Sequence, residues 1–106
     1  MNIDTIFFLN MVATVAEKLP GTELSSSYGT PAFKVKKKLY ARLKEDGTTL
    51  VVYTNEREKW MKKKPATFFI TDHYKDWPLM LIDLKSVGKK DLKHLIEASW
   101  KIRGGK

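Results

Sequence analysis

In the stretch YGTPAFKVKKKLYARLKEDGTTLVVY, residues 28–53, apolar and polar side chains alternate, and two short polar loops interrupt the alternation. Alternation of this kind predicts β-strands that turn one face toward a core. The lysines at 36–38 predict a three-residue loop, across which Val35 pairs with Leu39. The other pairs that follow from this loop are Phe33 with Ala41 and Lys34 with Tyr40.

The second loop contains Asp46 and Gly47, and Asp-Gly is a strong signal for a two-residue hairpin turn. A turn centred there predicts the pairs Leu43 with Leu50, Ala41 with Val52, Arg42 with Val51 and Tyr40 with Tyr53. The face expected to pack on helices comprises Phe33, Val35, Leu39, Ala41, Leu43, Leu50 and Val52. The face expected to stay open comprises Lys34, Tyr40, Arg42, Lys44, Val51 and Tyr53.

Three other segments have apolar residues at helical spacing. Residues 3–18 form the first, which ends before Pro20 and Gly21. The second, NEREKWMKKK at 55–64, begins with Asn55 as the expected cap and has Glu58 at the capping-box position. The third, residues 89–103, has His94 on its polar side and a predicted apolar face of Leu92, Leu95, Ile96, Ser99 and Ile102.

Two further strands are predicted at 67–71, TFFIT, and at 79–84, LMLIDL. The resulting order is helix, three strands, helix, two strands, helix. This order is typical of a two-layer α+β domain with an antiparallel, five-stranded sheet. We expect residues 1–106 to form one such domain, since the chain has the length of a single domain.

The composition excludes some chemistry and favours one class of partner. The chain has no cysteine, so thiol catalysis, disulfides and cysteine metal sites are excluded. The apolar first twenty residues lack the basic start of a signal peptide and are too short to span a bilayer, so we expect a cytoplasmic protein without membrane contact. The net charge is +8, and residues 34–64 contain eleven Lys or Arg but only four Asp or Glu. Such a surface attracts phosphate polymers.

The segments SSSYGTPAFKV, KLYARL, NERE, TFFITDHYKDWPLMLIDL and LIEASWKI resemble the MmcQ/YjbR family of small bacterial proteins. The resemblance extends over nearly the whole chain, and YGTPAFKV and TDHYKDWP are its specific parts. It implies an α+β fold related to the frataxin-like (CyaY) and secretion-chaperone folds. It also implies the DNA binding that is predicted for the family, with hairpins as the wings of a double-wing motif.

Two features depart from what the resemblance implies. Family members often have glycine where this chain has Lys37, so a lysine there would adopt a left-handed conformation at a cost of about 1 kcal/mol. Frataxins bind iron through an acidic first helix, whereas the first predicted helix here has only Asp4 and Glu17. We therefore expect no iron site of that kind, and no other metal or cofactor.

The lysine loop and the expected open face together form a candidate nucleic-acid site. Its Lys and Arg side chains would contact phosphates, and a tyrosine on an open sheet would stack on an unpaired base. The predicted site residues are Lys34, Lys36, Lys37, Lys38, Tyr40, Arg42, Lys44 and Tyr53. We expect a small non-enzymatic domain that binds DNA or another nucleic acid largely through phosphates. Lysines at hairpin tips also prevent aggregation, which is the simpler explanation for them.

The alternative function is protein interaction, chaperone-like or through self-association, with no nucleic-acid role. Leu79 and Leu81 would point to the open face and, with Phe68 or Phe69, form an apolar contact patch. Catalysis would have to use His73, but no nucleophile elbow accompanies it, and two histidines alone make no zinc site. We expect His73 and Tyr74 to fix their turn by hydrogen bonds.

Overall fold

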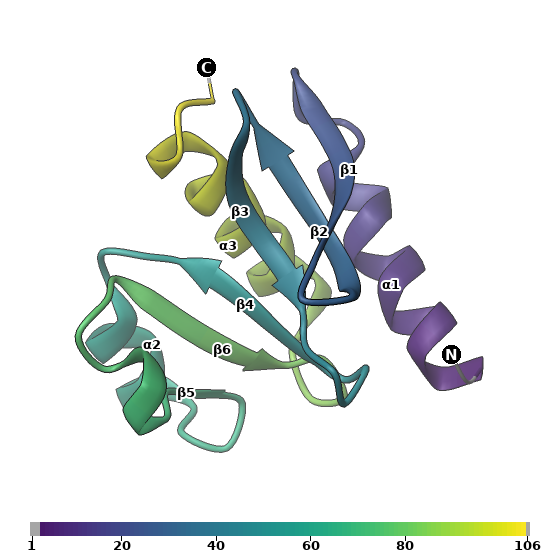
Figure 1. Ribbon diagram of the computed structural model, residues 1–106. Helices are drawn as coiled ribbons and strands as arrows, with labels where there is room; N and C mark the ends of the chain where they lie inside the picture. The colour runs from purple at the N-terminus through teal and green to yellow at the C-terminus, as the bar shows by residue number, and fades with distance from the viewer. Residues whose placement is uncertain (1–2, 106) are drawn as a thin grey trace.

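The computed structural model describes residues 3–105, with side chains from Thr5 onward; the side chain of Asp4 lies outside this part. The fold is α+β with an antiparallel sheet and three α-helices, as the sequence predicts. Helices α1 and α3 cover one face of the sheet, and the other face is largely open (Figure 1). The elements are α1 (Ile3–Ala16), β1 (Thr22–Ser27), β2 (Thr30–Val35), β3 (Lys38–Leu43), β4 (Thr49–Tyr53), α2 (Arg57–Lys63), β5 (Phe68–Phe69), the 3-10 helix η1 (Asp72–Tyr74), β6 (Leu79–Asp83) and α3 (Lys89–Ile102).

The sheet has six strands in the order β1-β2-β3-β4-β6-β5, so the prediction of five strands is wrong. The strand that the sequence pattern missed is β1, which pairs with β2 from Thr22 opposite Val35 to Ser27 opposite Thr30. Its sequence TELSSS has a single large apolar residue, Leu24, and that side chain is exposed. An edge strand of this composition shows no alternation, because it contributes almost nothing to the core.

The loop between β2 and β3 is shorter than predicted. Phe33 does pair with Ala41, but Lys34 pairs with Leu39 and Val35 with Lys38. The turn therefore consists of two residues, Lys36 and Lys37, with φ of 51° and 68°. Two consecutive left-handed residues are typical of a type I′ turn, whose twist matches that of the two strands it joins.

The cause of this shift is a β-bulge at Tyr40. Its neighbours Ala41 and Leu39 pair with Phe33 and Lys34, which are consecutive on β2, so Tyr40 itself has no partner. The bulge turns Tyr40 to the helix side, where it is fully buried and its hydroxyl bonds the Thr22 Oγ1 at 2.8 Å. Burial raises the pKa of the Tyr40 phenol. Leu39 moves to the open face and is half-buried. The predictions that Tyr40 lies on the open face and Leu39 in the core are both wrong.

The predicted pairing of Tyr40 with Tyr53 is replaced by a contact with α3. The Ser99 hydroxyl donates to the Tyr40 carbonyl at 2.5 Å and accepts from the Tyr53 amide at 2.9 Å. The other predicted pairs of this hairpin are confirmed, from Ala41 opposite Val52 to Leu43 opposite Leu50. Beyond Ala41 the strands β3 and β4 diverge (Figure 1).

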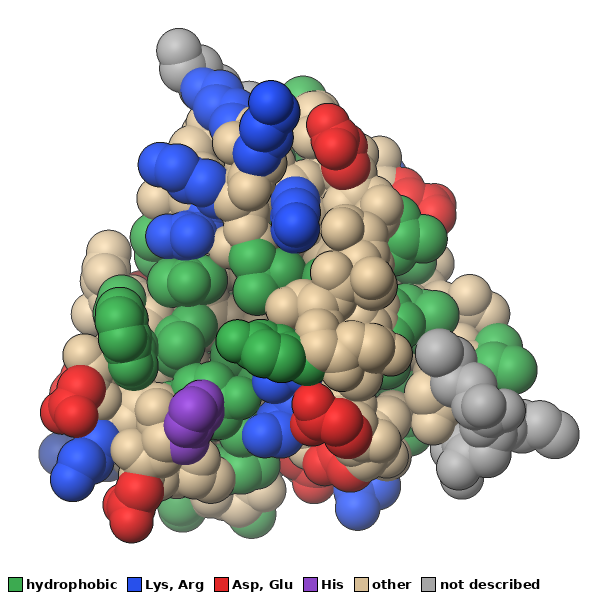
Figure 2. Space-filling model, viewed as in Figure 1, with side chains coloured by type: hydrophobic (Ala, Val, Ile, Leu, Met, Phe, Trp, Pro, Cys, Tyr) green, Lys and Arg blue, Asp and Glu red, His purple; other side chains and the backbone are tan. Residues whose placement is uncertain are grey.

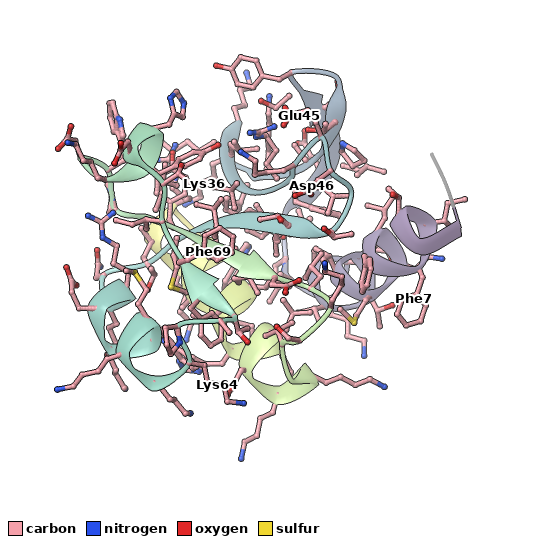
Figure 3. The ribbon with its side chains drawn as sticks, turned by 90° about the horizontal axis from the view of Figure 1, so that it is seen from below. Phe7, Lys36, Glu45, Asp46, Lys64 and Phe69 are labelled. Atoms are coloured by element: carbon pink, nitrogen blue, oxygen red, sulfur yellow. The ribbon has the colours of Figure 1, made fainter. Side chains whose placement is uncertain are left out.

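The β3–β4 loop keeps the predicted register but not the predicted turn. The Gly47 amide donates to the Lys44 carbonyl at 2.9 Å, and the Lys44 amide donates to the Thr49 carbonyl at 2.8 Å, so the loop has four residues, 45–48. Asp46 is not left-handed, as a primed turn would require, and only Gly47 has a positive φ of 74°. A Cβ at Gly47 would lie 2.1 Å from the Thr5 Oγ1, so glycine also lets this loop approach α1. Glu45 and Asp46 lie in this loop (Figure 3).

Asp46 organises the loop through its carboxylate, which accepts from the Thr48 amide, the Thr49 amide and the Thr49 hydroxyl. Burial opposes its ionisation, but these hydrogen bonds outweigh burial and keep the pKa of Asp46 below its ordinary value.

The helices differ from prediction mainly at their ends. Helix α2 begins at Arg57 after Glu56, and Asn55 is not its cap; the Thr54 hydroxyl instead accepts from the Glu56 amide. On α3 the buried residues include Trp100, whose Nε1 donates to the Pro20 carbonyl at 3.0 Å, whereas Ile102 is exposed.

The core contains, among others, Val12 and Ala16 of α1, Phe33, Leu43, Leu50 and Val52 of the sheet, and Leu92, Leu95 and Ile96 of α3.

Replacing Ser99 by Ala tests whether its hydroxyl bridges the diverging strands. Ser99→Ala would leave the Tyr40 carbonyl and the Tyr53 amide without a partner, so we expect a loss of about 2 kcal/mol in the free energy of unfolding. Urea denaturation measures this. Ser26→Ala, which removes an exposed hydroxyl from the edge strand β1, is the control, and a loss below about 0.5 kcal/mol for Ser99→Ala would contradict the bridge.

Replacing Asp46 by Ala should destabilise the protein by about 1 kcal/mol near neutral pH. Because the folded pKa of Asp46 is lowered, its contribution is complete above the unfolded pKa of about 3.8 and disappears as the pH falls through the folded value. The difference in unfolding free energy between wild type and Asp46→Ala should therefore shrink below about pH 4. Asp76→Ala, in another exposed loop, is the control, and a pH-independent difference would refute the role of the carboxylate.

Candidate nucleic-acid interface

The open face of the sheet contains a cleft of about 380 Å³, which we call the open-face cleft. It lies where β3 and β4 diverge. The strands line it with Leu39, Tyr40, Ala41, Arg42, Val51, Tyr53 and Leu79. Two turns complete it with Tyr28, His73, Tyr74 and Trp77. Apolar side chains gather in the middle of this face, and Lys and Arg gather at the end where the β2–β3 turn lies (Figure 2).

Helix η1 and the segment that joins it to β6 cover part of the open face. Tyr74 is buried there and packs with Val51 and Leu81. Leu81 is only 2% exposed, so of the two leucines of the predicted contact patch only Leu79 is partly accessible. Phe68 is buried and Phe69 is half-buried, while Leu79 lines the cleft. The alternation of β6 is as expected, but Tyr74 packs on Leu81, which is why Leu81 is not exposed.

Arg42 lies on the open face, as predicted, but it is nearly buried. Its guanidinium donates to the Thr30 hydroxyl at 3.2 Å, to the Glu45 carboxylate at 3.1 Å and to the Tyr74 hydroxyl at 3.2 Å. Desolvation opposes its charge, yet the hydrogen bonds with Tyr74 and Glu45 prevail and raise the pKa of Arg42. Three of its five N–H donors are therefore engaged inside the protein, and little of the side chain is open to a phosphate. The guanidinium also lies 5.4 Å from the centre of the Tyr28 ring.

Arg103, which follows the last residue of α3, also contacts both the backbone and an aromatic ring at the cleft. Its Nε donates to the Leu39 carbonyl at 2.8 Å, and its guanidinium carbon lies 4.1 Å from the centre of the Tyr53 ring. One face of the half-buried Tyr53 ring is thus occupied by a cation.

Arg57, the first residue of α2, fixes the segment 74–79. Its guanidinium donates to four backbone carbonyls, those of Tyr74, Lys75, Trp77 and Leu79. Only the planar fork of an arginine can bind so many carbonyls at once. This clamp positions Trp77, whose side chain is 62% exposed at the cleft.

The predicted lysines fall into two groups by exposure: three are exposed, and Lys34 and Lys44 are half-buried. Lys36, Lys37 and Lys38 are exposed at the turn between β2 and β3. Lys34 is half-buried on β2, opposite Glu23 of β1. Lys44 lies near the other end of β3, with its Nζ 5.2 Å from the centre of the Tyr74 ring. The lysine turn, residues 36–38, is therefore the part of the predicted site that is fully available to a ligand.

His73 lines the cleft and is exposed. The centres of its ring and the Tyr74 ring are 4.8 Å apart, in an edge-to-face contact. Tyr74 fixes its segment by hydrogen bonds, as expected, but among the side chains described, Thr5 onward, none forms a hydrogen bond or ion pair with the His73 imidazole. Over the same residues, no three His, Asp or Glu side chains come together in a way that would bind a metal ion. No helix in the described part of the chain has the length and apolar character needed to cross a membrane.

Sequence reasoning missed Tyr28, Trp77, Arg57 and Arg103. One signal was present, since the chain has only three arginines against seventeen lysines, and all three arginines surround this cleft. The positions of Tyr28 and Trp77 had no such signal, because their exposure depends on how the turns fold.

A second apolar hollow lies between α1 and α3, lined by Phe7, Met11, Val15 and Leu92 among others, with a volume of about 320 Å³. Phe7 projects from α1 away from the sheet and is 61% exposed (Figure 3). Among the described side chains, Lys89 is the one charged group that lines it.

Comparisons with known proteins agree with this architecture. The crystal structure of Deinococcus radiodurans protein DR2400, whose family-model domain is DUF419, has a TM-score of 0.77 against this chain at 19% sequence identity. The match covers 89% of this chain and 76% of that chain. At this identity the likeness establishes the fold. A search of the curated proteins found no match.

The family comparison concerns the sequence itself. The model of the YjbR family matches residues 17–102, a range that includes β1 to β6, α2 and the whole of α3. The match thus contains every residue that lines the open-face cleft. The chain belongs to the YjbR family.

Proposed function

We propose that this domain binds nucleic acid through the open face of its sheet, with the lysine turn as the main contact to phosphates. The observation that carries the proposal is the conformation of that turn. Lys36 and Lys37 both occupy the left-handed region, where a non-glycine residue costs about 1 kcal/mol, and both side chains are exposed. The fold does not need lysine at either position, so the strain serves to display charge.

The arrangement of charge favours the open face, rather than the surface formed by α1 and α3, as the surface that binds nucleic acid. Three exposed lysines and Arg103 lie at one end of the open-face cleft, and an anion that contacted them would reach the cleft directly. The hollow beside Phe7 is apolar, with Lys89 at its margin. A polyanion binds where cations cluster, since each neutralised phosphate releases counterions.

The proposed function is binding without catalysis. His73 is exposed at the cleft, and no acid or nucleophile among the described side chains, from Thr5 onward, is hydrogen-bonded to it. General acid–base catalysis by histidine normally requires such an orienting partner. Nucleic acid, DNA or RNA, is the proposed partner, and the contacts to phosphate imply little preference for sequence.

The turn allows a test in which loss of binding cannot result from unfolding. The double variant Lys36→Asn/Lys37→Gly removes two charges and installs Asn-Gly, the residue pair that this turn type favours. We expect the free energy of unfolding to rise by about 1 kcal/mol while affinity for a labelled oligonucleotide falls about tenfold or more at low salt. Fluorescence anisotropy across a salt series measures the affinity, and the slope of log K against log salt should become shallower by about 2.

The matched control is Lys90→Gln/Lys93→Gln, which removes two exposed lysines from α3, the helix that covers the other face. It should lower affinity far less than the turn variant. Equal losses in the two variants would show that only net charge matters, and an unchanged affinity in the turn variant, or no binding by wild type at about 50 mM salt, would refute the proposal.

A further inference from the structure

Within the proposed function, we propose that the open-face cleft accepts an unpaired nucleobase, which stacks against Tyr28 and Trp77, so that the domain prefers single strands to duplexes. The proposal rests on the nucleic-acid binding argued above and names the form of nucleic acid. Four observations carry it: the exposed aromatic rings, the strain at Tyr28, the arginine supports and the position of the lysine turn.

The aromatic side chains at the cleft are unusually open to solvent. Tyr28 is 86% exposed and Trp77 is 62% exposed, whereas Trp60 and Trp100 are buried in the core. Large exposed aromatic rings beside a hollow are typical of binding surfaces. Base–aromatic stacking is also the main energy that single-strand binders use besides charge.

Tyr28 is displayed at a cost in backbone strain. It precedes Gly29 in the two-residue turn between β1 and β2, and its φ is 53°. Asn would adopt this conformation with less strain than a bulky aromatic residue. The ring buries little surface in return, because it is almost fully exposed. An observed backbone outlier of this kind is a reason to infer function.

Arginines preorganise the cleft. Arg42, fixed by Thr30, Glu45 and Tyr74, lies 5.4 Å from the centre of the Tyr28 ring. Arg57 binds the Trp77 carbonyl at 2.5 Å together with three neighbouring carbonyls. Rigid supports of this kind lower the entropy lost when a ligand binds.

The chemistry of the cleft selects its occupant. Leu39, Val51 and Leu79 provide an apolar surface, and the cleft volume is at the lower end of the range of about 300–1,000 Å³ that small-ligand pockets occupy. The lysine turn lies at the end of the same face (Figures 1 and 2). A flat ring joined to an anionic chain complements both features. The bases of a duplex are already stacked on one another, so they cannot enter without unpairing.

The experiment compares a labelled single strand of about 16 nucleotides with the duplex of the same sequence, by anisotropy at about 50 mM salt. Tyr28→Asn removes the ring and relieves the turn, so we expect a higher melting temperature and affinity for the single strand about fivefold or more lower. Trp77→Ala should have the same effect on affinity, and both variants should bind the duplex as wild type does. Phe7→Ala, which removes an exposed ring from α1, is the control and should change neither affinity.

The outcomes separate this inference from the proposed function. If wild type binds single strand and duplex equally, or if Tyr28→Asn and Trp77→Ala weaken both alike, the base site is refuted while phosphate binding stands. If neither form binds, both proposals fail. A change in tryptophan emission with protein concentration, in the absence of oligonucleotide and lost in both Trp77→Ala and Tyr28→Asn, would assign the cleft to a second copy of the chain and overturn the base site.

Discussion

The Ser99 hydroxyl sits between the Tyr40 carbonyl and the Tyr53 amide, and the shape of the open face depends on it. Two antiparallel strands that diverge leave backbone groups without partners, which is costly in a protein interior. Here one fully buried side chain from α3 satisfies a donor and an acceptor at once. The bulge at Tyr40 can therefore persist, β3 and β4 can part, and the cleft forms where they do.

The division of labour between arginine and lysine follows from their geometry. Each of the three arginines binds backbone or side-chain acceptors around the cleft, as the planar guanidinium allows. The lysines of the turn, in contrast, are exposed point charges. The arginines thus build a rigid surface, and the lysines give it the positive charge that a polyanion would meet.

Backbone strain is concentrated in the two turns of this face. The non-glycine residues with positive φ within residues 3–105 are Tyr28, Lys36 and Lys37, and all three belong to turns that adjoin β2. Elsewhere glycine occupies such positions, as Gly47 does where the β3–β4 loop meets Thr5. Local rules of residue preference are thus broken only where an aromatic ring or a charge is displayed, and functional sites are where such violations are expected.

The sequence by itself determined the α+β class, the three helices, the helix-facing alternation of β6 and the register from Ala41 to Leu43 opposite β4, because these follow from local periodicity. It also identified the lysine turn and the family. Only the tertiary structure decided that Tyr40 is a core residue, that Leu81 is covered and that Tyr28 and Trp77 flank a cleft. The physical reason is distance along the chain: Ser99 acts on Tyr40 from 59 residues away, and Arg57 acts on Trp77 from 20. No local pattern encodes such contacts, so neither the bulge nor the cleft could be predicted before the chain was folded.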